Sequence, residues 1–106
     1  MLMASEPDIS EQLPGSQARR LAKKILREGS TVFTHHARQE MENDDLFETD
    51  VVNTISGGMI TEPGELGHRG DWCYRIRTQR ITVVFMFRST EELVVVTAWR
   101  ERRRGQ

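Results

Sequence analysis

The chain has 106 residues, of which 37% are hydrophobic and 29% charged, and its formal net charge is -1. This length supports one hydrophobic core and excludes two independent ones, and a single cysteine excludes an internal disulfide. No window holds the ~18 apolar residues of a membrane span and no secretory signal opens the chain, so we expect a cytoplasmic protein that does not enter a membrane.

Residues 1–15 lack a clear period and end in Pro-Gly, which predicts a flexible tail. An amphipathic helix is expected next, with Ser16 as its N-cap and Gly29 as its C-terminal stop. Basic residues fill its outer face, so the helix either packs on a core with solvated cations or binds nucleic acid or a membrane. Its apolar residues follow helical spacing: Ala18, Leu21, Ala22, Ile25 and Leu26.

Two short helices are predicted after a brief β-prone piece at Thr31–Phe33. Thr34 can cap the first of them, which runs over residues 35–42 and ends at an acidic turn. Thr49 can cap the second, and Gly57 and Gly58 close it. Both helices are too short to be stable without a sheet behind them.

The second half of the chain follows strand periodicity. Met59–Glu62 is a candidate strand, and Glu65–Gly70 is expected to form a mobile loop. Trp72–Arg77 alternates, which predicts one apolar and aromatic face and one face with arginines. Ile81–Phe87 and Leu93–Trp99 are nearly continuous apolar runs, typical of strands covered on both faces.

These strands have short connections, which require antiparallel pairing. Helices that come first and strands that come later indicate the α+β class, with the helices packed on one face of an antiparallel sheet of three to four strands. We expect residues 16–100 to form a single domain, followed by a basic tail at residues 101–106.

Charge is distributed unevenly along the chain. Residues 38–66 carry eight acidic residues against a single arginine, a net charge of -7, whereas residues 72–106 carry eight arginines against three glutamates, a net charge of +5. Such asymmetry either steers an acidic or phosphate-bearing partner to one face or reflects solvated surfaces of mixed charge.

Two segments resemble a known family. Phe33-Thr34-His35-His36-Ala37 and Val95-Val96-Thr97-Ala98-Trp99 are similar to the Phe-Thr-x-His-Ala opening and the closing Val-Val-Thr-Ala-aromatic strand of a family of small bacterial domains of unknown function. The resemblance covers residues 32–100. That family is in turn similar to RelE-like toxins, including MqsR-like messenger-RNA interferases, in which helices pack on a curved antiparallel sheet and RNA is cut on its open face.

The resemblance implies a metal-independent endoribonuclease without a cofactor, with RNA and an antitoxin-like protein as its partners. His36 matches the family histidine, and an unperturbed pKa near 6.5 suits it to general acid or base catalysis. The arginines can hold a phosphate with paired donors, and aromatic rings can stack on bases. The implied catalytic residues are His36, Arg75, Arg77 and Thr97, and the implied RNA-binding residues are Arg80, Tyr74 and Trp99.

Each of these residues also has a structural interpretation. His36 can hydrogen-bond to backbone in the first helical turn, the arginines can be the solvated side of a strand, and the aromatic residues can belong to the core. No metal site is predicted, because adjacent histidines point in different directions on a helix. Cys73 lacks the helix N-terminus that lowers a thiol's pKa.

A noncatalytic module therefore stays open as the alternative, binding a protein through a strand edge or the N-terminal helix. In its favour, the chain has no lysine after Lys24 and carries an acidic segment beside the family motif, whereas active RelE-like enzymes display several cations around the site.

Overall fold

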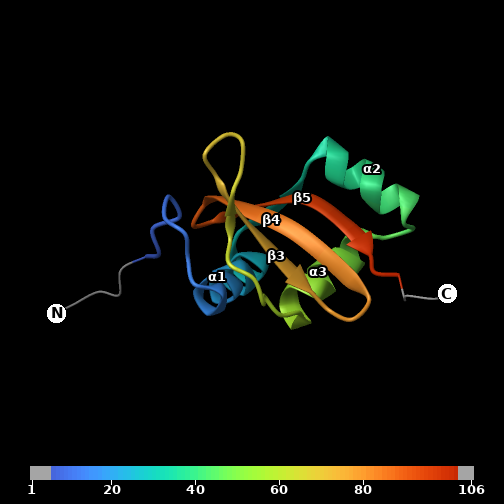
Figure 1. The fold of residues 1–106 in the computed structure, drawn as a ribbon, viewed down its shortest axis with the longest axis horizontal. Helices are drawn as coiled ribbons and strands as arrows, with labels where there is room; N and C mark the ends of the chain where they lie inside the picture. The colour runs from blue at the N-terminus through green and yellow to red at the C-terminus, as the bar shows by residue number, and fades with distance from the viewer. Residues whose placement is uncertain (1–5, 103–106) are drawn as a thin grey trace.

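The computed structural model describes residues 6–102 and confirms the α+β class, with three helices packed on a five-stranded, mostly antiparallel open sheet (Figure 1). None of the helices in these residues is long and apolar enough to cross a membrane. The elements in chain order are α1 (Gly15–Glu28), β1 (Ser30–Phe33), α2 (His35–Asn43), α3 (Glu48–Gly57), β2 (Glu65–Leu66), β3 (Trp72–Arg77), β4 (Ile81–Ser89) and β5 (Glu92–Arg100).

The sheet has the strand order β1-β5-β4-β3-β2. Strands β3, β4 and β5 form the predicted antiparallel meander, while β1 adds to the outer edge of β5 in parallel. The expected strand at Met59–Glu62 is wrong, because only Met59 pairs, in an isolated bridge with Arg77. The short β2 lies instead at the start of the segment predicted to be a loop.

Local hydrogen bonds explain where the helices begin and end. The hydroxyl of Thr34 accepts from the amide of Ala37 at 2.9 Å, so Thr34 caps α2 as predicted. Helix α3 begins before the expected cap at Thr49, because the Asp50 carboxylate accepts from the amide of Phe47 at 2.8 Å. Helix α1 begins at Gly15, earlier than its expected cap, and ends at the predicted glycine.

One face of the sheet is covered by α1 and α3, which pack against each other and against the strands (Figure 1). The register places the core residues of the strands in rows on this face: Tyr74 pairs with Phe85, which pairs with Val95. All three are fully buried, as are Ala22 and Ile25 of α1. The hydrophobic core of the domain lies between this face of the sheet and the helices.

The segment before α1 packs on the domain, in contrast to the predicted flexible tail. Leu13 is buried, Ile9 packs against the core, and the Trp72 indole donates to the carbonyl of Ser10 at 3.1 Å. The apolar residues of this segment have no period because they follow irregular backbone. Residues 1–5 of the predicted tail lie outside the described residues.

The opposite face of the sheet is the open face. Alternation along β3 and β4, together with a register shift between Val84 and Phe85 that leaves Val96 without a partner in β4, brings Arg75, Val84 and Thr97 into one row of this face. Arg77, Thr82 and Trp99 form the next row. The prediction that β4 is covered on both faces is wrong for its middle part, because Val84 is only half-buried. Helices α1 and α3 occupy the other side, so this face is available to a ligand.

Candidate functional site

The open face brings together four of the residues that the sequence singled out. Arg75 and Arg77 come from β3, and Thr97 and Trp99 come from β5, with β4 between them. All four are partly exposed. The strand over residues 72–77 was expected to present arginines on one side. The pairing of the strands shows that Thr97 and Trp99 of β5 lie on that same side of the sheet.

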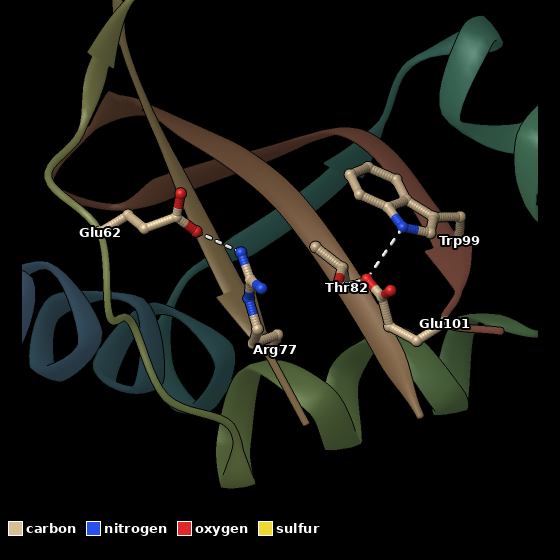
Figure 2. A network of polar contacts seen from close by, with 5 residues as sticks. All are labelled: Glu62, Arg77, Thr82, Trp99 and Glu101. Atoms are coloured by element: carbon tan, nitrogen blue, oxygen red, sulfur yellow. Dashed lines mark hydrogen bonds and ion pairs between the residues drawn. The ribbon is translucent and has the colours of Figure 1, made fainter. Parts of the chain in front are cut away.

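Arg75 and Trp99 interact directly. The guanidinium carbon of Arg75 lies 5.7 Å from the centre of the Trp99 ring, which is within the range of a cation–π contact. The Trp99 indole N–H donates to the carboxylate of Glu101 at 3.0 Å (Figure 2). These two contacts orient the ring, so the open face has an aromatic side chain next to a cation.

Glu101 also links β5 to β4. The hydroxyl of Thr82 donates to the same carboxylate oxygen that accepts from Trp99 (Figure 2). Thr82 is fully buried beneath this contact, whereas Glu101 itself is exposed. The carboxylate is therefore oriented by two donors while it remains in contact with solvent.

Arg77 forms an ion pair with Glu62, which comes from the segment between α3 and β2 (Figure 2). Its side chain is 38% exposed. The Arg77 Nε atom is buried and has no hydrogen-bond partner within the described part of the chain. A buried donor without a partner costs free energy, so the Arg77 guanidinium is only partly satisfied by its ion pair with Glu62.

His36 lies in the first turn of α2, which packs along β5. Because a helix turns by about 100° per residue, His36 and Arg38 point in nearly opposite directions. The guanidinium carbon of Arg38 lies 5.1 Å from the centre of the Phe33 ring, and its Nη1 donates to the carboxylate of Glu48 at 2.8 Å. His36 therefore lies on the side of α2 away from Arg38.

The imidazole of His36 is 62% exposed, and its Nε2 is 3.9 Å from the carboxylate of Glu40 in the same helix. Among residues 6–102, no hydrogen bond or ion pair joins His36 to Arg75 or Arg77. The ion-pair contact of this histidine therefore lies within α2, whereas the arginines lie on the open face.

Tyr74 is not at the open face. It is 1% exposed, and its hydroxyl accepts a hydrogen bond of 2.8 Å from the amide of Leu13. Burial raises the pKa of this phenol. The expectation that Tyr74 contacts RNA is corrected, because the alternation that exposes Arg75 and Arg77 must direct Tyr74 into the core.

Arg80 lies in the turn between β3 and β4, at one end of the sheet, and its side chain is exposed. Its carbonyl accepts from the amide of Glu101 at 2.7 Å, so this turn is tied to the end of β5. Arg80, Arg100 and Glu101 line a hollow of about 410 Å³ there. The second cation, Arg100, extends the basic character of this end of the sheet.

Cys73 also lies on the open face, paired with Met86. Burial raises the pKa of the Cys73 thiol, and the nearby carboxylates of Asp71 and Glu65 raise it further. The protonated form is therefore favoured, which does not suit a nucleophile. Within residues 6–102, no three His, Cys, Asp or Glu side chains are arranged to hold a metal ion.

Sequence reasoning missed Glu62, Thr82 and Glu101. Thr82 lies within an apolar stretch of sequence, so no pattern singled it out. The register of β3 and β4 pairs it with Arg77. Glu101 fell within the predicted basic tail, yet it directly follows β5 and its carboxylate accepts from Thr82 of β4. The position of Glu62 depends on a loop fold that no local pattern indicates. Residues 103–106 of the predicted tail lie outside the described residues.

Comparison with known proteins adds one assignment. A search of curated proteins and a search of solved structures each found no match. A family profile matches residues 33–100, which run from the last residue of β1 to the end of β5 and include every residue of the open face except Glu101. The chain therefore belongs to the family of domains of unknown function designated DUF4258.

Proposed function

We propose that this domain is related to RelE-like toxins and that it binds and cleaves single-stranded RNA on its open face without a metal ion. The observation that carries the proposal is the convergence of Arg75, Arg77, Thr97 and Trp99 on that face. The packing of α1 and α3 on the other side, which leaves this face uncovered, supports the relationship.

Binding rests on the two arginines and the tryptophan. Arg75 and Arg77 donate paired hydrogen bonds to the phosphates on either side of a nucleotide. Trp99 and the guanidinium plane of Arg75 offer surfaces on which a base stacks. Phosphate contacts of this kind make affinity fall as salt concentration rises.

Cleavage requires a base, an acid and donors for the phosphorane. The Glu101 carboxylate, held by Thr82 and Trp99, takes the proton of the ribose 2'-OH, and the 2'-oxygen attacks phosphorus. The bond from phosphorus to the 5'-oxygen breaks, and protonated His36 gives its proton to that oxygen. The products are a 2',3'-cyclic phosphate and a 5'-hydroxyl.

The test is incubation of the full chain with end-labelled single-stranded RNA in EDTA. We expect cleavage to be lost in His36→Ala and Glu101→Gln and to be unchanged in His35→Ala, which removes the neighbouring histidine. Arg75→Gln and Arg77→Gln should weaken RNA binding. Intact RNA in the presence of the folded wild-type protein, or full activity of His36→Ala, contradicts the catalytic proposal.

A noncatalytic binding module is the second candidate. It is favoured by the ion pair between Arg77 and Glu62, which neutralises part of the cationic surface, and by the contact of His36 with Glu40. Under this proposal the folded protein leaves RNA intact. If the protein retains RNA on a filter, it is an RNA-binding module. If it retains no RNA, the protein-binding module is the candidate that stands.

A further inference from the structure

A second cationic surface lies on α1, away from the open face. The outer side of this helix and the segment after α3 enclose a groove of about 820 Å³, which we call the α1 groove. Five basic residues of α1 line it: Arg19, Arg20, Lys23, Lys24 and Arg27.

The charge of the α1 groove is compensated only at Arg27, which lies 3.9 Å from the carboxylate of Glu28, within residues 6–102. Its lining contains no acidic residue. Arg19 donates through its Nε to the carbonyl of Gly58 at 2.7 Å, so this cation is held in place. Within residues 6–102, no carboxylate lies within 4.0 Å of the side-chain nitrogens of Lys23 or Lys24. These ammonium groups are therefore available to an acidic ligand.

The groove also has an apolar wall. Met59 is 57% exposed, which is high for a large apolar side chain, and Ile60 beside it is half-buried. Methionine adapts its shape readily and is common at surfaces that bind apolar side chains. Both residues line the same groove as the cations of α1. The groove thus offers apolar contact and positive charge side by side.

The α1 groove is independent of the open face. Helix α1 packs on the covered side of the sheet, and its residues precede the segment that matches the family, residues 33–100. A ligand of this groove does not compete with one on the open face, and the inference below does not rest on the proposed function.

We propose that the α1 groove binds an acidic, amphipathic segment of a partner protein. The cations would pair with its carboxylates, and Met59 and Ile60 would contact its apolar side chains. A peptide fits better than RNA, because no aromatic side chain lines the groove and single-stranded RNA depends on such rings for stacking. Charge complementarity also speeds association with an acidic partner.

The test uses a fluorescein-labelled helical peptide of about a dozen residues with glutamates on one face and leucines on the other, titrated with the full chain and followed by anisotropy. We expect saturable binding that weakens with salt, and a loss of about tenfold in affinity in Lys23→Gln/Lys24→Gln. The matched control is Arg69→Gln/Arg88→Gln, which removes the same charge elsewhere and should bind like wild type. Met59→Ser should also weaken binding.

Three results would overturn the proposal. One is no binding of the peptide by the folded wild-type chain. Another is equal binding of a peptide in which serine replaces every leucine, since charge alone would then explain the affinity. The third is displacement of the peptide by a single-stranded RNA oligonucleotide in wild type and in Arg75→Gln alike, which would make the groove a nucleic-acid site. All substituted residues are partly or fully exposed, so the variants should fold.

Discussion

The backbone amide of Leu13 donates a 2.8 Å hydrogen bond to the hydroxyl of Tyr74, which lies 61 residues further along the chain. Both groups are buried. The contact joins the segment before α1 to the central part of β3, and it explains why that segment is ordered although its sequence has no regular pattern. Tyr74 is therefore a structural residue of this fold.

Replacement of Tyr74 by phenylalanine should lower the free energy of unfolding by about 1–3 kcal/mol, because the Leu13 amide loses its acceptor while it stays buried. Urea denaturation followed by circular dichroism measures the change. Gln12→Ala is the control, since it removes a hydrogen bond to Gly64 from an exposed side chain of the same segment. A larger loss in the control than in Tyr74→Phe would contradict this assignment.

Substitution by aspartate should lower the free energy of unfolding by different amounts at two valines on neighbouring strands. Val95 is fully buried in the core, so Val95→Asp should cost about 4 kcal/mol or more and unfold the domain. Val84 lies on the open face and is half-buried, so Val84→Asp should cost clearly less. Thermal unfolding of both variants compares the two sides of the sheet, and equal losses would show that the open face is covered in solution.

Adjacent glycines at the end of α3 provide a matched pair. A Cβ atom at Gly58 would lie 2.6 Å from the carbonyl oxygen of Thr54 and 2.8 Å from that of Arg77, whereas one at Gly57 meets no atom within 4 Å. Gly58→Ala should therefore destabilise the domain by about 1–3 kcal/mol, since backbone must move. Gly57→Ala should be neutral or slightly stabilising. Chemical denaturation tests both, and tolerance of alanine at residue 58 would speak against the close approach of Arg77.

Cys73 should react slowly with iodoacetamide. Burial raises the pKa of its thiol, so at a given pH near neutrality a smaller fraction is thiolate than in an unfolded chain. As pH is raised, the alkylation rate of the native protein should increase at a higher pH than that of the urea-unfolded protein. Mass spectrometry measures both rates. Asp71→Asn should speed the native reaction, because it removes one negative charge near the thiol. A native rate equal to the unfolded rate would contradict this environment.

Periodicity was enough to predict the three long strands, the three helices and the stops at Gly29 and Gly58, because these depend on neighbours in the chain. It failed for β2 and for the segment around Leu13, whose backbone bonds to partners far along the sequence. Arg75, Arg77 and Trp99 were found through alternation and the family motif. Glu62, Thr82 and Glu101 were missed, since only the register and the loop path bring them to the open face.

The amino-acid sequence by itself determined which stretches are helical or extended and which side chains of β3 share a side, because both are consequences of local geometry. In β5 the pairing with β4 decided the sides, since a register shift puts Val95 and Thr97 on opposite faces. Tertiary structure decided which of those sides is buried. Helices α1 and α3 cover the side with Tyr74, Phe85 and Val95, where most apolar surface leaves water, and the side with the arginines stays open. That choice depends on contacts between distant segments, and it is what creates the candidate site.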